Sequence, residues 1–385
     1  MKILLLSVHP PEAGGSAYSS QELAVQMRGL GHEVIHLSPY KSTAQRPQYP
    51  GLVWFEADFP ADLAVGPDVR SHIDYCVQET YLHYGPFDLV ILGRESFLWQ
   101  ISAIRRVHHR KPVVAICRGA YINRLAGNEA IAPQLRQQLI EFYRDCDQII
   151  CIARHLVTAL ERVIGCHPTR FLPNPIALPP FTPGTRYHPT AQDPIRLLMA
   201  AQIKPRKRPL DALEIVRILV KKKLPVHLTI CGSGIQMSQM LATIDRDRLH
   251  PYVAVKGRVD RAEVLDCLQK VETVLLCSDH EGLPRILQEA IAASKGIVAY
   301  NNPGSAEALT GGSDQWPLGR LVSVGDCHGA SAAIVELARY FRSTATPVSL
   351  PPFPNTRAIV HEYEALFQGL ISAQISSHSS LQAVR

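Results

Sequence analysis

The stretch "CSDHEGLPRILQEAIAASKGIVAYNN", residues Cys277 to Asn302, decides the fold prediction. An apolar run ends at its first residue, a Gly-Leu-Pro turn follows, and an amphipathic segment leads into a second apolar run, Ile297–Tyr300. That order predicts a strand, a loop, a helix and a further strand, which is the repeating unit of a parallel sheet. Two acids, Glu281 and Glu289, stand in this segment although it is otherwise suited to burial.

The placement of these acids favours a binding site. In an open parallel sheet, ligands lie beyond the carboxyl ends of the strands, where the loop with Glu281 falls. Pro284 suits the first turn of the following helix, so Glu281 and the backbone amides of Gly282 and Leu283 gather at its positive end. Glu289 lies further along the same helix. Two solvated surface acids are the ordinary alternative.

The same alternation of apolar runs and amphipathic segments extends over the chain. The helical segments include Ser16–Leu30 and Pro133–Arg144, and the pattern predicts an α/β fold with two doubly wound, Rossmann-like domains that face a cleft. The predicted strands are Ile3–Val8, Val34–Leu37, Leu89–Leu92, Val113–Cys117, Gln148–Ile152, Ile195–Ala201, Val226–Cys231, Val253–Lys256, Thr273–Cys277 and Ile297–Tyr300.

The length of 385 residues also predicts more than one domain, since single domains usually hold about 50–200 residues. Pro173–Thr190 is rich in proline and glycine and is the predicted linker. We expect a first domain over 1–180, a second over 190–350, a helix over 351–372 that can pack back on the first domain, and a disordered tail over 373–385.

The composition is that of a soluble globular protein, with 46% hydrophobic and 19% charged residues. The nine cysteines include no C-x-x-C pair, which argues against disulfides and zinc and for a reducing compartment. The run "MKILLLSV" stops at Pro10-Pro11 without a cleavage site, so it predicts a strand instead of a signal peptide. We expect a cytoplasmic protein.

A formal charge of +6 is mild, but basic residues cluster at Arg105–Lys111, Lys204–Arg208 and Lys221–Lys223. Solvated helix faces are one interpretation, and attraction to phosphate or to an anionic membrane surface is the other. The first of these clusters suggests peripheral contact with the inner membrane face. We expect no nucleic-acid partner, and we expect His108 and His109 to be exposed.

Metal dependence is also considered. Asp145-Cys146-Asp147 and Asp245-Arg246-Asp247 both spell D-x-D, but each falls at a predicted helix end and not in a loop after a strand. Chance explains them better than coordination. We therefore expect no metal and no cofactor.

Three more loops follow predicted strands. Gly14-Gly15 precedes Ser16, a suitable N-cap, so bare amides there can meet an anion or a sugar, or the glycines can simply form a tight turn. "CGSG", Cys231–Gly234, is a lone G-x-G and weak evidence. "AQIKPRKRP", which begins at Ala201, brings cations to a strand end.

In this context the chain resembles the family 4 glycosyltransferases, retaining enzymes of the two-domain GT-B fold. The family's E-x7-E pattern is matched by Glu281 and Glu289 within "SDHEGLPRILQEAIA", and its glycine-rich first loop resembles Gly14-Gly15. "FLPNPI", Phe171–Ile176, stands where the family's first domain ends. The resemblance covers nearly the whole chain and is strongest over Val253–Leu309.

The resemblance implies transfer of a sugar, of the hexosyl type, from a nucleotide diphosphate to an acceptor hydroxyl with retained configuration. Front-face displacement, in which the leaving phosphate helps to take the acceptor proton, requires no protein nucleophile. The implied roles are Glu281 and the amides near Gly282, Leu283 and Pro284 for the donor sugar, Glu289 for the ribose, Lys207 for the diphosphate, Gly232 and Gly234 for the nucleotide loop, Arg258 and Val259 for the base, and Glu307 as a further acid near the donor.

Two positions depart from the family pattern. Gln202 stands where the family usually has an arginine, and Arg118-Gly119 stands where it often has His-Gly. Arg118 is a candidate to supply the missing cation. The leading hypothesis is a transferase of polysaccharide biosynthesis acting on a glycan or lipid-linked acceptor. A GT-B-shaped nucleotide-sugar epimerase and a catalytically silent nucleotide-sugar-binding protein remain alternatives.

Overall fold

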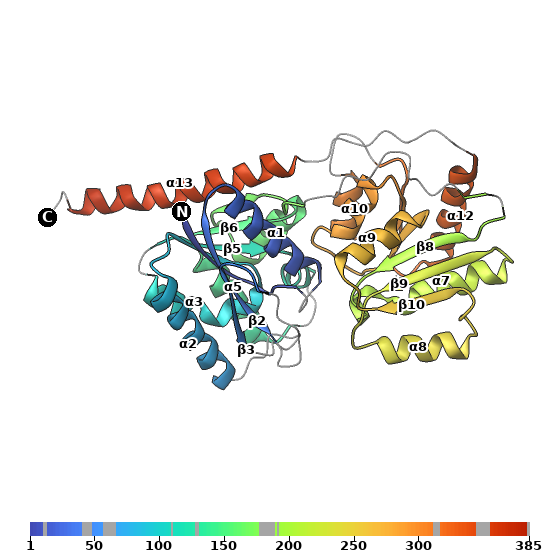
Figure 1. Cartoon of the computed structure of the whole chain (residues 1–385), viewed down its shortest axis with the longest axis horizontal. Helices are drawn as coiled ribbons and strands as arrows, with labels where there is room; N and C mark the ends of the chain where they lie inside the picture. Colours follow the sequence, from blue (N-terminus) through green and yellow to red (C-terminus); the bar gives the residue numbers. More distant parts are fainter. Residues whose placement is uncertain are drawn as a thin grey trace. The chain divides into compact units, whose positions relative to one another are not determined.

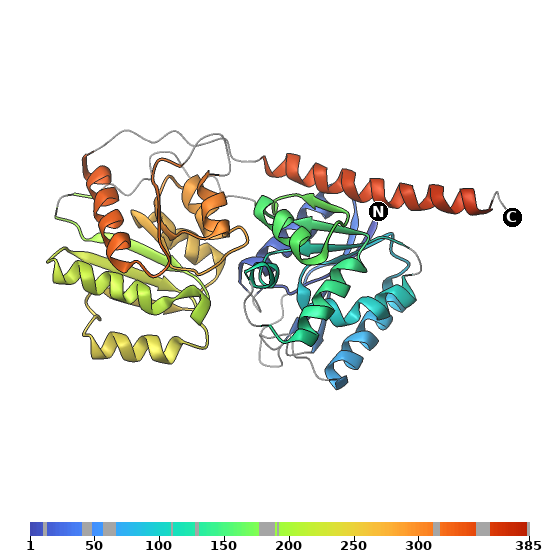
Figure 2. The same ribbon diagram turned by 180° about the vertical axis from the view of Figure 1, so that it is seen from behind.

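The computed structural model describes residues 1–10, 14–40, 48–56, 67–108, 111–127, 131–176, 189–190, 192–310, 316–343 and 355–382. The chain divides into two compact units, which Figures 1 and 2 show from opposite sides. The first unit is Met1–Ala177 with Pro354–Arg385, and the second is Leu178–Phe353. The boundary falls inside the predicted linker Pro173–Thr190, of which residues 177–188 lie outside the described residues.

The first unit is built on a seven-stranded parallel sheet with the strand order β3-β2-β1-β4-β5-β6-β7. The order reverses between β1 and β4, which makes their carboxyl ends the switch point of the sheet. The strands are β1 (Lys2–Leu6), β2 (Glu33–Tyr40), β3 (Leu52–Glu56), β4 (Leu89–Leu92), β5 (Val113–Cys117), β6 (Gln148–Cys151) and β7 (Thr169–Phe171). The helices are α1 (Gly15–Gly29), α2 (Pro67–Tyr84), η1 (Glu95–Gln100), α3 (Ile101–Val107), α4 (Ile122–Ala126), α5 (Pro133–Arg144), α6 (Arg154–Ile164) and α13 (Thr356–Gln382).

The second unit repeats the plan with a six-stranded parallel sheet of order β10-β9-β8-β11-β12-β13. Here the switch point lies between β8 and β11. The strands are β8 (Ile195–Ala200), β9 (Val226–Cys231), β10 (Val253–Gly257), β11 (Thr273–Leu276), β12 (Gly296–Tyr300) and β13 (Gly319–Val322). The helices are η2 (Pro205–Lys207), α7 (Pro209–Lys221), α8 (Met237–Arg246), α9 (Arg261–Gln269), α10 (Arg285–Ala292), α11 (Pro303–Thr310) and α12 (Cys327–Ser343).

The predicted fold class is therefore confirmed, although the sequence missed β3, β7 and β13. These strands are short, lie at sheet edges and are mostly half-buried. Most of the strands that were predicted are largely buried and form apolar runs, as β4 and β5 do, a signal that is weaker in a partly exposed edge strand. The edge strand β10 was predicted although it is mostly half-buried.

The C-terminal helix α13 packs on the first unit. Thr356 Oγ1 donates a hydrogen bond to the Ile176 carbonyl at 2.7 Å, and Tyr363 Oη donates to the Leu172 carbonyl at 3.3 Å. The prediction of a disordered tail over 373–385 is wrong for residues 373–382, which continue the helix, and residues 383–385 lie outside the described residues. The reason is that no glycine or proline follows Gly369 to end the helix.

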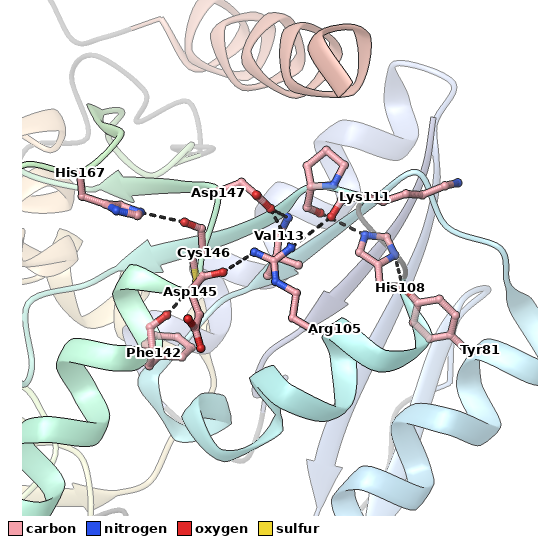
Figure 3. A network of polar contacts seen from close by, with 11 residues as sticks. Tyr81, Arg105, His108, Lys111, Val113, Phe142, Asp145, Cys146, Asp147 and His167 are labelled. Carbon is pink, nitrogen blue, oxygen red and sulfur yellow. Dashed lines mark hydrogen bonds and ion pairs between the residues drawn. The ribbon is translucent and has the colours of Figure 1, made fainter. Parts of the chain in front are cut away.

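The basic segment Arg105–Lys111 takes part in the network of polar contacts in Figure 3, at the amino ends of β5 and β6. His108 is only 3% exposed, so the expectation of a solvated histidine is wrong there, while His109 lies outside the described residues. Arg105 Nη1 donates to Asp147 Oδ2 at 3.0 Å, and the same oxygen accepts from the Val113 amide at 2.7 Å.

The rest of the segment also has intramolecular roles. Lys111 Nζ donates to the Phe87 carbonyl at 2.8 Å, and His108 Nε2 donates to the Pro112 carbonyl at 3.1 Å. Arg106 keeps a largely exposed side chain and lies 3.9 Å from Asp74. Two cations of the segment, Arg105 and Lys111, thus bind neighbouring parts of the first unit. In the described part of the chain, no helix is both long and apolar enough to cross a membrane.

Candidate functional site

The switch point of the second sheet holds an ion pair between Lys207 and Glu281. Lys207 ends η2, which follows β8, and Glu281 lies in the loop after β11, the strand that pairs with β8. Glu281 is 7% exposed. Two residues that are far apart in sequence thus meet at the place where parallel sheets of this type bind ligands.

The two loops that carry this pair are tied together. Arg206 Nη1 donates to the His280 carbonyl at 2.9 Å, and the Asp279 amide donates to the Arg206 carbonyl at 2.9 Å. Arg208 adds ion pairs to Asp211 at 2.7 Å and to Asp279 at 3.3 Å. Its backbone has a φ of 45°, in the left-handed region that costs energy for a residue with a side chain.

Burial and charge act in opposite directions on the ion pair. Burial works to raise the pKa of Glu281, but the positive charges of Lys207 and Arg206 outweigh it, so the pKa lies below its ordinary value. Burial lowers the pKa of Lys207, and the attraction of Glu281 offsets part of that effect. The site therefore holds Glu281 ionised next to two cations.

Glu289 lies on α10 and is held by two arginines. Its Oε1 atom accepts from Arg285 Nε at 2.9 Å and lies 2.7 Å from Arg261 Nη1 of α9. The residue is 4% exposed, so the carboxylate is a nearly buried charge with its charge partners in place. Two helices of the second unit thus fix the orientation of one acid.

The glycines after β9 lie against the loop after β8. A Cβ on Gly232, whose φ is +151°, would lie 1.8 Å from the Ala201 carbonyl oxygen, and one on Gly234 would lie 2.3 Å from the Ile203 oxygen. Neither position tolerates a side chain. The exposed Arg258 reaches the same loop, with Nε 3.4 Å from Ser233 Oγ. Val259 follows it, half-buried.

A third loop, after β12, also meets the Glu281 loop. A Cβ on Gly304 would lie 2.4 Å from the Gly282 carbonyl oxygen and 2.5 Å from that of Glu281. Asn302 caps α11, because its Oδ1 accepts from the Ser305 amide at 3.0 Å, while its Nδ2 donates to the Ser278 carbonyl at 3.0 Å. The backbone around Glu281 is thus fixed from both sides.

The remaining predicted residues of the second unit lie around this centre. Gln202 is exposed directly after β8, Leu283 is half-buried, and Glu307 is half-buried on α11. Pro284 is the N-cap of α10 and not part of its first turn, because the helix begins at Arg285. The helix therefore begins one residue later than predicted.

In the first unit, Gly14 and Gly15 begin α1 at the switch point of the first sheet. Gly14 is the N-cap and Gly15 the first helical residue, so the predicted cap at Ser16 is wrong. Glycine is among the residues preferred at an N-cap, and no side chain accepts a hydrogen bond at this one.

Arg118 follows β5 and is held inside the first unit. Its guanidinium donates to the Gly93 carbonyl at 3.0 Å, to Asn174 Oδ1 at 2.6 Å and to Ser20 Oγ at 2.9 Å. Asn174 belongs to the "FLPNPI" stretch, and Ser20 belongs to α1. Arg118 therefore joins the ends of β4 and β5 to α1 and to the end of the first domain.

The described residues contain no group of three or more His, Cys, Asp or Glu side chains that could hold a metal ion. In the first D-x-D sequence Asp147 pairs with Arg105, and in the second Asp245 lies 2.6 Å from His250 and Asp247 pairs with Arg246.

The sequence did not identify Arg261, Arg285, Arg206, Asp279 or Asn302 as site residues. The i,i+4 spacing of Arg285 and Glu289 is a signal that reveals one of these contacts. Arg261 comes from another helix, so no local spacing points to it.

Both units match known protein families. The model described as "Glycosyltransferase Family 4" matches residues 13–178, and the model described as "Glycosyl transferases group 1" matches residues 186–337. The amylovoran biosynthesis glycosyltransferase AmsK of Erwinia amylovora is 24% identical over 182 residues, which cover 46% of this chain and 44% of AmsK. The aligned part thus spans less than half the length of that relative.

Solved structures of the same fold include two nucleotide complexes. HepE of Anabaena, in complex with UDP and glucose, is 16% identical with a TM-score of 0.69, covering 98% of this chain and all of HepE (100%). The pneumococcal O-GlcNAc transferase GtfA, in complex with UDP and GlcNAc, is 12% identical with a TM-score of 0.70, covering 96% of this chain and 99% of GtfA. With two parallel sheets, a glutamate pair at the predicted spacing and a family match over each half, this chain belongs to the family 4 glycosyltransferases of the GT-B fold.

Proposed function

We propose that the protein is a retaining glycosyltransferase that moves a sugar from a nucleotide-diphosphate donor to a hydroxyl of a glycan or glycolipid acceptor, without a metal ion. The observation that carries this proposal is the buried Lys207–Glu281 pair at the β8–β11 switch point. It combines a cation for a leaving phosphate with an acid for sugar hydroxyls in one rigid pair of loops.

In this proposal Lys207 stabilises the negative charge that grows on the diphosphate as the glycosidic bond breaks. Glu281 accepts hydrogen bonds from the donor sugar, together with the amides of Gly282 and Leu283. The ties among Arg206, Asp279 and Arg208 keep the two groups oriented before the donor arrives. Orientation and electrostatic stabilisation are the usual sources of rate in such a reaction.

The nucleotide lies, in this proposal, between Glu289 and the glycine loop. Glu289 binds the ribose hydroxyls, since a carboxylate can accept further hydrogen bonds while two arginines hold it. Gly232 and Gly234 leave room for the nucleotide beside the backbone, and Arg258 with Val259 flanks the base. The donor nucleotide we propose is UDP, which the HepE and GtfA structures contain.

The acceptor side is assigned to the first unit, with Gly14, Gly15 and Arg118 at its switch point. AmsK is named for the biosynthesis of amylovoran, and this supports a role in polysaccharide biosynthesis. A lipid-linked acceptor would be reached from the cytoplasmic face of a membrane. Any peripheral contact with anionic lipid needs basic residues other than Arg105 and Lys111, because these two already bind Asp147 and the Phe87 carbonyl.

A donor screen followed by turnover assays tests the function. Thermal shifts with UDP, GDP, ADP and their sugars should give stabilisation with one nucleotide, about 2.7 kcal/mol at 100 times its dissociation constant. Transfer to an acceptor hydroxyl, with the anomeric configuration read by NMR, should follow with EDTA present. A donor converted to its epimer without acceptor would support an epimerase, and binding without turnover would support a silent binding protein.

A further inference from the structure

Arg94 lies at the switch point of the first sheet, directly after Gly93 at the carboxyl end of β4. Its side chain forms no hydrogen bond and no ion pair within the described structure. Ligands of open parallel sheets lie beyond the carboxyl ends of the strands, at the point where the strand order reverses. None of the roles proposed above uses this residue.

The backbone that carries Arg94 is held in place. A Cβ on the preceding Gly93 would lie 2.7 Å from Ser7 Oγ and 3.2 Å from Ser20 Oγ, so the end of β4 packs closely against the loop after β1 and against α1. Arg118 Nε donates to the Gly93 carbonyl at 3.0 Å. The strand end is thus fixed from two sides, and it presents the Arg94 side chain from a rigid position.

The positive charge of Arg94 is poorly compensated where it lies. The residue is half-buried, and burial lowers the pKa of its guanidinium although Glu95 and Tyr121 act to raise it. Glu95 is itself 4% exposed, and its Oε1 atom accepts from Tyr143 Oη at 2.9 Å. A guanidinium has five N–H donors. An anion that accepts hydrogen bonds from them would supply the missing charge.

The neighbouring loops add to the positive charge of this edge. In the described residues 93–95, 118–127 and 152–154, which follow β4, β5 and β6, Glu95 is the only acid and the arginines number four. These arginines are Arg94, Arg118, Arg124 and Arg154. The amino end of α1 has no acid in its first turn and adds partial positive charge at the end of β1. Such an edge attracts anions.

We propose that Arg94 binds an anionic group of the acceptor, a phosphate or a carboxylate, beyond the carboxyl end of β4. The planar guanidinium suits both groups, because two of its N–H groups can bind two oxygens of one anion. A phosphate would come from a sugar phosphate or a lipid-linked acceptor, and a carboxylate from a uronic acid unit of a glycan. The assignment to the acceptor rests on the proposed function, but the anion binding itself does not.

Binding of matched anionic and neutral sugars to the full chain tests the site. The probes are glucose 1-phosphate, methyl glucuronoside and methyl glucoside, with the nucleotide of largest thermal shift present at saturation to fill the donor site. We expect at least one anionic probe to bind about tenfold more tightly than methyl glucoside, which corresponds to about 1.4 kcal/mol. Titration by saturation-transfer NMR measures the affinities. The better anionic probe distinguishes a phosphate-bearing acceptor from a uronic acid glycan.

Two arginine-to-glutamine substitutions form the matched pair of variants. Arg94→Gln removes the charge and should abolish the preference for the anionic probe. Arg162 is exposed in the last turn of α6, at the far end of the helix that follows β6, so Arg162→Gln should leave the preference unchanged. Arg94→Lys keeps a charge without the planar guanidinium and should retain part of the preference.

The stability of the variant separates binding from a structural role. Because the Arg94 guanidinium has no hydrogen-bond partner in the described structure, Arg94→Gln should not lower the melting temperature of the ligand-free protein. A melting temperature several degrees lower would show that the guanidinium holds the fold together, and it would overturn the proposal.

The binding outcomes also separate this site from the proposed function. Equal affinity for all probes, an equal preference in Arg94→Gln, or an anionic signal that the nucleotide abolishes would overturn the anion site. Turnover of a neutral acceptor with the same KM in Arg94→Gln would do so too, and would leave the transferase function intact. Anion binding that Arg94→Gln removes, in a protein without turnover, would support the site and contradict the function.

Discussion

Arg261 of α9 reaches Glu289 of α10, with its Nη1 atom 2.7 Å from Oε1 of the carboxylate. In the proposed function Arg261 touches no substrate and acts through Glu289, which makes it a positioning residue. Arg261→Ala should therefore raise the KM for the donor about tenfold while kcat stays near its original value, because Glu289 loses one of its two charge partners. Isothermal titration with UDP should show the same loss of affinity.

Arg261→Lys is the control for this prediction. It restores one charge without the planar guanidinium, so it should recover part of the affinity. Unchanged UDP binding in Arg261→Ala would show that Arg285 alone orients the carboxylate.

The two glutamates should separate binding from turnover. Glu289→Gln should weaken UDP binding by about tenfold or more, since a hydrogen bond to a charged group contributes about 1.5–3 kcal/mol. Glu281→Gln should leave UDP affinity nearly unchanged and lower kcat, because its proposed partners are sugar hydroxyls and Lys207. Titration calorimetry and initial rates measure the two effects. An equal loss of UDP affinity in both variants would contradict the assigned roles.

The spacing of these glutamates was the strongest part of the sequence prediction, because loop and helix are continuous in sequence. Lys207 and Glu281 are 74 residues apart, and only the parallel pairing of β8 with β11 brings them together. The sequence therefore supplied both residues, and the family resemblance supplied their roles, but neither supplied the ion pair.

Other features depend on long-range packing and were missed for that reason. Arg118 binds Ser20 and Asn174, which lie 98 and 56 residues away, so no local pattern predicts that its guanidinium is held there. His108 lies at the end of a basic helix and looks solvated in sequence, yet Tyr81 of α2 and the Pro112 carbonyl enclose its ring.

Gly304 should not tolerate a side chain. Gly304→Ala places a Cβ 2.4 Å from the Gly282 carbonyl oxygen, so the Glu281 loop must shift. Overpacking of this kind costs about 1–3 kcal/mol, and both the melting temperature and the stabilisation by UDP-sugar should fall.

Gly369 is the matched control, because it lies in α13 and its added Cβ meets nothing within 4 Å. Gly369→Ala should raise the free energy of unfolding by up to about 1 kcal/mol, since alanine favours the helix. Scanning calorimetry compares the two variants. Equal stability of Gly304→Ala and the original protein would show that α11 and the Glu281 loop can move apart without a cost in stability.

His108 should make the stability of the protein fall in mild acid. Its Nδ1 atom accepts from Tyr81 Oη and its Nε2–H donates to the Pro112 carbonyl, so the folded ring is neutral and binds a second proton only when the Tyr81 hydrogen bond rearranges (Figure 3). Burial is the main cause that lowers its pKa from 6.5 to about 4. Nearby Lys111 and Arg105 lower it further, while the Pro112 hydrogen bond and Asp147 oppose them.

The sign follows from proton binding by the two states. Well above pH 6.5 neither state binds the proton, and the contribution of His108 to stability is complete. Between pH 6.5 and about 4 the unfolded chain binds a proton that the folded chain excludes, so stability falls as the pH falls. The total loss of stability from this residue is on the order of 3 kcal/mol.

His108→Gln should be less stable than the original protein at pH 7.5 and should lose less stability on acidification. Urea denaturation at pH 7.5 and at the acid end of the range measures both effects. The control is His83→Gln, at an exposed position of α2, which should leave the dependence of the free energy of unfolding on pH unchanged. An equal pH dependence in His108→Gln and His83→Gln would show that other groups cause the acid sensitivity.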